Sequence, residues 1–279
     1  QFYFEKFKIS NKMKRVLFLL LLIVPSSVLA GSYALFSLTN DNYVVENNVE
    51  EIRSIASITK MITAITILSS GVNLDEKVKV NGRSHGRVPT NALMSRMDLL
   101  KAMLVSSDNR AAETLANHHP GGFNAFIVDA NQYLEKNNLL NTHVVDSSGL
   151  LPGNVSTARE LIKLLSLVKD NPVIRSIAGE RNVSVSAPRG RKIITLNLHN
   201  TNPEIFTYDN ILISKTGYTN PAGRCVLMLV EKGKELYALV VLGQKNVRDR
   251  SRIVNDLLHI DFDKKLFDNS DKNSYKYIM

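Results

Sequence analysis

Hydrophobic and polar residues along the chain predict strands at its two ends and helices between them. Residues 32–39 alternate between apolar and polar positions, 40–42 are typical of a turn, and 43–45 return to a strand-like pattern, which indicates a β-hairpin. Three further apolar, β-rich segments, separated by links that contain glycine and asparagine, lie at 210–217, 225–230 and 236–242. The hairpin and these segments can form one five-stranded antiparallel sheet.

Amphipathic periodicity in the middle of the chain predicts the helices that cover this sheet. Apolar residues recur at helical spacing directly after Ser57, whereas 73–88 is polar and predicts loop with short strands. Thr157 and Glu160 have the spacing of a capping box, and Pro172 suits the first turn of a short helix. The other predicted helices are 97–105, 110–118, 123–134 and, at the end of the fold, 248–258. Helices packed on an antiparallel sheet define an α+β domain.

The pattern of the N-terminal residues predicts where the protein is located. Residues 13–15 are a short basic start, 16–24 are nine consecutive apolar residues, and 28–30 have the small-residue character of a cleavage site. This pattern is typical of a secretory signal peptide, and its apolar core is too short for a comfortable transmembrane helix. We therefore expect an exported, periplasmic protein with a signal peptide over 13–30.

Length, composition and charge limit the domain organisation and the classes of ligand that can be expected. Of the 279 residues 44% are hydrophobic and 22% are charged, as in a folded globular protein. The expected division is 1–30 as upstream residues plus signal peptide, 31–260 as one domain, and 261–279 as a polar tail. The formal charge is +9, and no basic run with interleaved aromatic residues suggests nucleic-acid binding. The single cysteine, Cys225, excludes an intrachain disulfide and is expected to pack in an apolar strand.

Ser57 and Lys60 are the first candidate catalytic pair. They lie three positions apart at the start of a predicted helix, so that the lysine amine can reach the serine hydroxyl. A serine needs an adjacent base, and burial lowers the pKa of a lysine enough to make it one, with the helix dipole acting in the same direction. Ser166 and Lys169 repeat the spacing, but they are expected to lie on an exposed helix face.

Two later motifs supply partners for this pair. Ser-Asp-Asn at 107–109 falls between two predicted helices. Ser107 offers a hydroxyl that can pass a proton between Lys60 and a leaving amine, and Asn109 offers an amide that can hold a substrate peptide group.

The third motif, Lys-Thr-Gly at 215–217, falls on a predicted strand. Lys215 places a positive charge that attracts a carboxylate, Thr216 offers a hydroxyl to the same group, and Gly217 lets backbone approach closely. The strand edge can pair with an extended peptide. The backbone N–H groups of Ser57 and Tyr218 are the expected oxyanion hole.

With these three motifs in this order, the chain resembles the low-molecular-mass penicillin-binding proteins, the D-alanyl-D-alanine carboxypeptidase and endopeptidase family. The resemblance covers about 33–258 and includes Gly149-Leu150 with Asn154. It implies a penicillin-binding-protein/β-lactamase transpeptidase-like fold, action on peptidoglycan stem peptides, acylation of Ser57, and covalent capture by β-lactam antibiotics, with no cofactor.

The resemblance also suggests a subtype. The segment Ser106-Ser-Asp-Asn-Arg-Ala-Ala112 looks like the D-alanyl-D-alanine endopeptidase branch, whereas typical carboxypeptidases carry Ser-Gly-Asn-Asp-Ala there. Carboxypeptidase action on pentapeptides is the alternative. The residues after 258 show no amphipathic stripe, so no stable membrane anchor is expected. In the carboxypeptidases an arginine after the last strand meets the substrate carboxylate, and Arg248 is the candidate here.

Three other classes are disfavoured. A class A β-lactamase needs a glutamate between the last two motifs, but no Glu-x-x-Leu-Asn pattern occurs there. The glutamates between these two motifs are instead expected to be exposed helix or loop charges: Glu113, Glu135, Glu160, Glu180 and Glu204. A metal-dependent peptidase needs clustered ligands, and the six histidines show no such spacing, so no metal site is predicted. A non-catalytic β-lactam sensor is usually attached to membrane-spanning helices, and no such helix is expected here.

Overall fold

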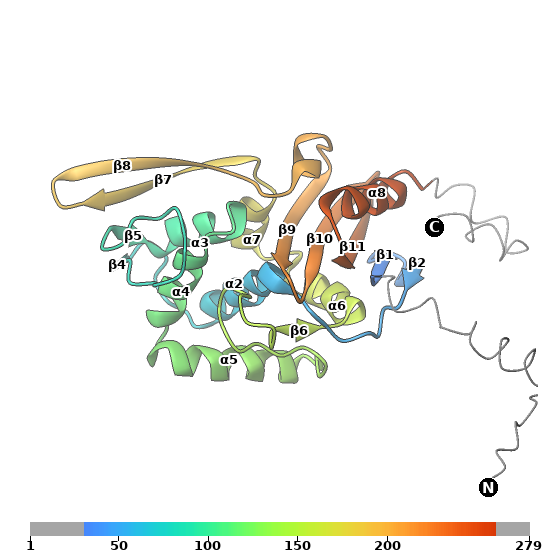
Figure 1. The fold of residues 1–279 in the computed structure, drawn as a ribbon, viewed down its shortest axis with the longest axis horizontal. Coiled ribbons are helices and arrows are strands. Elements are labelled where there is room, and N and C mark those ends of the chain that lie inside the picture. Colours follow the sequence, from blue (N-terminus) through green and yellow to red (C-terminus); the bar gives the residue numbers. More distant parts are fainter. Residues whose placement is uncertain (1–30, 261–279) are drawn as a thin grey trace, which may run out of the picture. The chain divides into compact units, whose positions relative to one another are not determined.

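The computed structural model describes residues 31–260, so the predicted signal peptide and C-terminal tail lie outside the described residues. A five-stranded antiparallel sheet has the order β2-β1-β11-β10-β9 (Figure 1). Its strands are β1 (Tyr33–Ser37), β2 (Asn42–Asn47), β9 (Ile211–Thr219), β10 (Gly223–Lys232) and β11 (Glu235–Gln244). The sheet predicted from the N-terminal hairpin and the three late strands is confirmed, and β9 lies at one of its edges.

Helices cover this sheet, as predicted, and the structure places them on both of its faces. The α-helices among residues 31–260 are α2 (Thr59–Ser69), α3 (Arg96–Val105), α4 (Asn109–Asn117), α5 (Gly122–Lys136), α6 (Ala158–Val168), α7 (Pro172–Ala178) and α8 (Val247–Leu258). Two 3₁₀ helices, η2 (Ala56–Ile58) and η3 (Pro203–Phe206), precede α2 and β9. None of the helices within 31–260 is both long and apolar enough to span a membrane.

Two hydrophobic cores lie on opposite faces of the sheet. Successive strand residues point to opposite faces, so Val226 and Met228 of β10 pack with α8, whereas Leu227 and Leu229 pack in the larger core that includes α2 and α6. Burial on both faces explains why β10 is continuously apolar from Cys225 to Val230 and does not alternate there.

Helix α2 runs through the larger core. Every residue from Thr59 to Ile67 is buried, so the helix carries apolar or small side chains on all sides. Lys60 is the one residue of a charged type among these buried positions, which points to a functional role for it. The exposed side chain of Ser166 on α6 agrees with the interpretation that Ser166 and Lys169 are a chance match.

Short sheets and a long hairpin complete the fold. Strand β3 (Arg53–Ser54) pairs with β6 (Val155–Ser156), and β4 (Lys77–Lys79) pairs with β5 (Leu93–Ser95). The prediction of short strands within 73–88 is confirmed by β4 alone, because its partner β5 lies beyond that range. The hairpin of β7 (Asn182–Arg189) and β8 (Lys192–His199) was not predicted.

Candidate active site

The structure places Ser57 in the 3₁₀ turn η2 and Lys60 in the first turn of α2. Their spacing brings Lys60 Nζ to 2.8 Å from Ser57 Oγ. The residue before the serine, Ala56, has a positive φ of 46°, a conformation that is strained for an L-residue. This turn presents the serine at the entrance to the buried helix rather than within it.

The surroundings of Lys60 favour an unprotonated amine. The side chain is fully buried, and desolvation lowers its pKa to about 7, although Asp146 and Asp108 act in the opposite direction. Its Nζ also lies 2.7 Å from Asn109 Oδ1 and 2.7 Å from the carbonyl oxygen of Ser148. Both oxygens only accept hydrogen bonds. A neutral amine donates its two hydrogens to them and directs its lone pair at the Ser57 hydroxyl.

Asp108 positions Asn109. Its Oδ1 accepts a hydrogen bond from the N–H of Ala111 at 2.8 Å and so caps α4, which makes Asn109 the first residue of that helix. Its Oδ2 accepts from the N–H of Val88 at 3.0 Å. The amide of Asn109 is thereby held against Lys60.

A loop over 146–154 supplies the carbonyl of Ser148, and sequence reasoning did not assign it a role. Asp146 organises this loop, because its carboxylate accepts hydrogen bonds from the N–H groups of Ser148 (2.7 Å), Gly149 (2.6 Å) and Leu151 (2.7 Å) and from Asn154 Nδ2 (2.7 Å). These bonds lower the pKa of Asp146 even though burial acts to raise it. The sequence signal for the loop was the Asp-Ser-Ser-Gly turn followed by Asn154.

Two glycines allow the backbone around Ser57 to close up. A Cβ on Gly149 would lie 1.9 Å from the carbonyl oxygen of Ala56 and 2.9 Å from the backbone nitrogen of Ser57. A Cβ on Gly217 would also lie 2.9 Å from that nitrogen. The loop and the edge strand therefore both press on the backbone of the serine, which agrees with the close approach expected at Gly217.

Ser107 and Lys215 form a second polar pair. Lys215 is buried, and its Nζ donates to Ser107 Oγ at 2.9 Å and to the carbonyl of Thr216 at 2.8 Å. Burial lowers the pKa of Lys215 well below its ordinary value, and repulsion from Lys60 adds to the shift. Ser107 has a φ of +58°. Lys60 thus contacts Asn109 directly, while the hydroxyl of Ser107 faces Lys215.

The rest of β9 lines the open side of this cluster. Thr216 Oγ1 lies 2.6 Å from Thr201 Oγ1. Tyr218 is half-exposed, and its hydroxyl donates to Asn220 Oδ1 at 2.9 Å, while the guanidinium of Arg224 stacks 3.6 Å from the centre of the tyrosine ring. Because β9 is an edge strand, its outer backbone groups are available for pairing.

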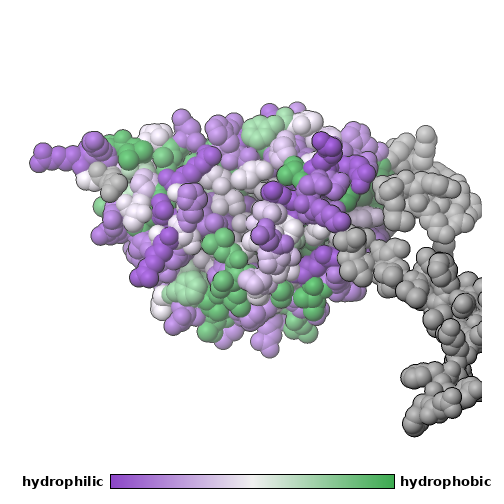
Figure 2. Space-filling model, viewed as in Figure 1, coloured by the Kyte–Doolittle hydropathy of each residue, from purple (hydrophilic) through white to green (hydrophobic). Residues whose placement is uncertain are grey.

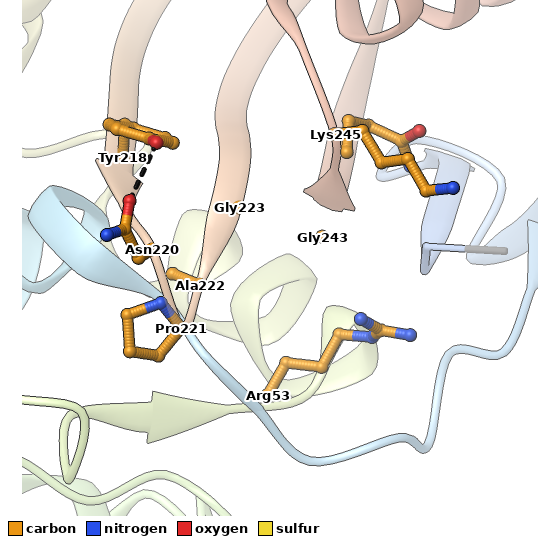
Figure 3. Close-up of a pocket in the computed structure, with 9 residues that line it drawn as sticks. Arg53, Tyr218, Asn220, Pro221, Ala222, Gly223, Gly243 and Lys245 are labelled. Atoms are coloured by element: carbon orange, nitrogen blue, oxygen red, sulfur yellow. Dashed lines mark hydrogen bonds between the residues drawn. The ribbon is translucent and has the colours of Figure 1, made fainter. Parts of the chain in front are cut away.

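A cavity of about 310 Å³ opens beside Tyr218, beyond the end of β9. Figure 3 shows Tyr218 and Asn220 on one side of it and Arg53 and Lys245 on the other. The turn between β9 and β10 at 221–223 and the end of β11 at 243–244 also line it.

Arg248 is not brought into the cluster. It is exposed in the first turn of α8, and the hydrogen bonds that join the described residues of the cluster do not include it. Two positions further along α8, Arg250 is buried and paired with Glu204, with Arg250 Nη2 3.0 Å from Glu204 Oε2.

The expectation that the intervening glutamates are exposed charges was wrong for two of them. Glu204 is buried against Arg250, and Glu160 is buried because its carboxylate accepts hydrogen bonds from Asn141 and Thr142. Both are tied to structural partners and not to Ser57 or Lys60. Glu160 also shows that the capping box is only half formed, since Thr157 Oγ1 accepts from the Glu160 N–H at 3.1 Å but the carboxylate turns away.

Fold and site together define a serine-type D-alanyl-D-alanine peptidase. The sequence profile described as D-alanyl-D-alanine carboxypeptidase, peptidase family S11, matches residues 23–246, and the chain belongs to this family. The D-alanyl-D-alanine endopeptidase of Escherichia coli K12 is 37% identical over 223 residues, which cover 77% of this chain and 71% of the relative. The protein of the same name from Pseudomonas aeruginosa is 37% identical over 225 residues, with the same two coverages.

Solved structures share the fold. A variant of the Streptomyces K15 DD-transpeptidase aligns with a TM-score of 0.77 at 23% identity, covering 83% of this chain and 97% of that one. Penicillin-binding protein D2 of Listeria monocytogenes in its cefotaxime-bound form aligns with a TM-score of 0.72 at 25% identity, covering 82% and 95%.

Proposed function

We propose that this protein hydrolyses D-alanyl cross-links between peptidoglycan stem peptides through an acyl-enzyme on Ser57. The observation that carries the proposal is the 2.8 Å contact between Ser57 Oγ and a buried lysine whose pKa is about 7. The cross-link specificity is supported by the second motif, Ser106-Ser-Asp-Asn109, and by the relatives named as endopeptidases.

Acylation begins when Lys60 accepts the proton of Ser57. The hydroxyl oxygen then attacks the D-alanyl carbonyl carbon, and the backbone N–H groups of Ser57 and Tyr218 donate hydrogen bonds to the developing oxyanion. The C–N bond breaks, the proton that Lys60 took up passes through the Ser107 hydroxyl to the departing amine, and an ester on Ser57 and a neutral Lys60 remain. A water molecule, deprotonated by the same lysine, hydrolyses that ester and restores the serine.

Ser107 and Lys215 lie on the leaving-group side. Ser107 passes a proton to the departing nitrogen, and its hydrogen bond with Lys215 keeps its hydroxyl oriented for this transfer. The substrate peptide pairs with the edge of β9, Asn109 Nδ2 donates to its backbone, and Thr216 holds a carboxylate beside Lys215. Arg248 lies on an exposed turn and would have to move to join them.

A β-lactam presents a strained amide to the same serine. The ring opens to an ester on Ser57, so we expect covalent labelling by penicillins. The Listeria protein has been solved in cefotaxime- and ampicillin-bound forms, and these agree with labelling of a shared fold.

Digestion of purified peptidoglycan tests the proposal. Monomers that accumulate from cross-linked dimers support endopeptidase action, and the Ser57→Ala variant is expected to release none and to lose labelling by a fluorescent penicillin. Carboxypeptidase action is the second candidate, because the matching family profile carries that description. It predicts free D-alanine from pentapeptides with dimers left intact, a product pattern that would replace the endopeptidase assignment.

We propose also that the protein acts outside the cytoplasm, where its substrate lies. The support is the signal-peptide pattern over 13–30. N-terminal sequencing of the exported protein is expected to give a start at Gly31, and a chain that retains residue 13 would count against it.

A further inference from the structure

The β7–β8 hairpin begins beside the active site. Thr201, two residues after the end of β8, bonds to Thr216 through Oγ1 at 2.6 Å, and its N–H donates to the carbonyl of Val105 at 3.2 Å. In Figure 1 the hairpin runs from this base past α3 and projects to the left edge of the domain. The base of the hairpin is thus linked to the Lys-Thr-Gly strand by the contact between Thr201 and Thr216, whereas its turn lies at the far end of the domain.

The two faces of this hairpin differ. The inner face packs against α3 and β5 through buried apolar side chains, among them Val185, Ala187 and Leu198. The outer face is exposed and carries uncharged polar groups in cross-strand pairs: Asn182 with His199, Ser184 with Asn197, and Ser186 with Thr195. The hydroxyl of Ser184 lies 2.8 Å from Asn197 Oδ1. The outer face is therefore a row of hydroxyl and amide groups that no described element covers, followed toward the tip by the apolar pair of Pro188 and the exposed Ile193.

The free end of the hairpin is basic. Residues 181–203 contain no aspartate or glutamate, and Arg189, Arg191 and Lys192 are gathered at the turn. Arg191 and Lys192 are exposed, and neither takes part in an ion pair between described residues. Figure 2 shows the tip itself as hydrophilic, with hydrophobic residues beside it. Cations placed without acidic neighbours attract an anionic ligand.

We propose that the outer face and tip of this hairpin bind polymeric peptidoglycan, as a surface separate from the peptide-binding edge of β9. A glycan strand offers hydroxyl and amide groups that match the neutral row, and stem peptides carry free carboxylates that match the basic tip. Strands of eight residues span about 26 Å. A polymer held along them reaches from Lys192 to Thr201, which contacts Thr216 of the Lys-Thr-Gly strand. The inference rests on the proposed function, because it assumes that the polymer is the substrate.

Sedimentation with purified insoluble peptidoglycan tests this surface. The full mature chain carries Ser57→Ala so that the polymer is not digested, and it is compared with the same protein carrying Arg191→Glu and Lys192→Glu. We expect binding to weaken about tenfold at low salt, because two surface charges are reversed. A matched control carries Lys136→Glu and Lys234→Glu, exposed positions on α5 and in the β10–β11 turn, and is expected to bind as the parent does.

Acylation by a fluorescent penicillin separates the two proposals. With Ser57 present, both charge-reversal proteins are expected to label within about twofold of the wild-type rate. A hairpin variant that still sediments like its parent overturns the binding surface and leaves the catalytic proposal standing. Equal losses in the hairpin variant and the control, or sedimentation of the parent with anionic lipid vesicles and not with peptidoglycan, also overturn it. A wild-type protein that is not acylated overturns the catalytic proposal itself.

Discussion

Lys60 sets the pH dependence of catalysis at the scale of a single residue. Burial lowers its pKa to about 7, so the neutral amine that deprotonates Ser57 is the minor form below that pH and the major form above it. We expect the second-order rate constant for acylation by penicillin to rise about tenfold per pH unit below 7 and to level off above it. Stopped-flow labelling between pH 5 and 9 measures this. A rate that keeps climbing through pH 9 would point to a lysine with an ordinary pKa.

Gly149 controls the position of the serine. Its φ is +83°, and a Cβ there would meet the carbonyl of Ala56 at 1.9 Å, so Gly149→Ala forces the loop away from η2. We expect acylation to fall about 100-fold, since a displacement of about 1 Å is enough for such a loss. Gly71→Ala is the matched control: its φ is +69° and nothing lies within 4 Å, so it bears only the backbone strain of about 1 kcal/mol. Similar acylation rates in the two variants would contradict the packing argument.

The reactive residues were predictable because their spacing is local. Ser57 and Lys60 are one helical turn apart, and 107–109 and 215–217 are contiguous motifs, so the sequence alone indicates which side chains meet. The Ser148 carbonyl that orients Lys60 lies 88 positions along the chain, and a backbone group has no side-chain identity to recognise. Arg248, the arginine expected to meet the substrate carboxylate, is exposed in the first turn of α8, because the sequence does not fix the register of that helix relative to the last strand.

The loop over 146–154 behaves as an element of its own, held by one carboxylate. Asp146→Asn keeps the shape but removes the charge that four donors share. We expect it to lower the free energy of unfolding by about 2 kcal/mol at pH 7 and to slow acylation, because hydrogen bonds to a charged group are the stronger kind.

The lowered pKa of Asp146 determines how the difference in stability between wild type and Asp146→Asn changes with pH. A carboxylate whose folded-state pKa is lowered contributes stability that is present above the unfolded pKa and is lost as pH falls through the folded one. Urea denaturation of wild type and variant should therefore differ most near neutral pH and converge well below pH 4. A gap that stays constant with pH would assign the effect to packing.

Helices and strands with a clear hydrophobic periodicity were predicted from the sequence, but the β7–β8 hairpin was not. Its strands alternate as Val-Ser-Val-Ser and Ile-Thr-Leu-Asn, which is a half-buried pattern, but the hairpin packs on α3 and joins no other sheet. The strand pattern alone does not show which element covers its apolar side, so the hairpin was not predicted. Glu160 illustrates the same limit, because its partners Asn141 and Thr142 come from another segment.

At the scale of the whole molecule, the sheet separates two cores, and α8 closes the smaller one. Val254 and Leu257 of α8 pack on Val226 and Leu239, on the side opposite to α2. The residues on either side of the serine, Ala56 and Ile58, pack in the larger core and the last helix packs in the smaller one, so a change in α8 can alter stability without touching the reacting groups.

The buried ion pair between α8 and η3 tests this separation. Arg250 Nη2 lies 3.0 Å from Glu204 Oε2, and each side chain is only 5% exposed. Arg250→Met leaves the carboxylate buried without its cation, and we expect it to lower the free energy of unfolding by about 3–5 kcal/mol. Replacing Glu204 with Met as well removes the orphaned charge and is expected to recover most of that loss. Arg252→Met, on the exposed face of the same helix, should cost less than about 0.5 kcal/mol.

Urea denaturation of the four proteins of this double-mutant cycle measures the coupling between the two side chains. In the double variant, penicillin acylation should remain within about twofold of wild type, because Ser57, Lys60 and the loop that orients them lie across the sheet from α8. A double variant that is as unstable as Arg250→Met alone would show that the arginine stabilises α8 by packing and not by neutralising Glu204. A stable double variant that had lost acylation would instead show that the smaller core positions the edge strand β9 for catalysis.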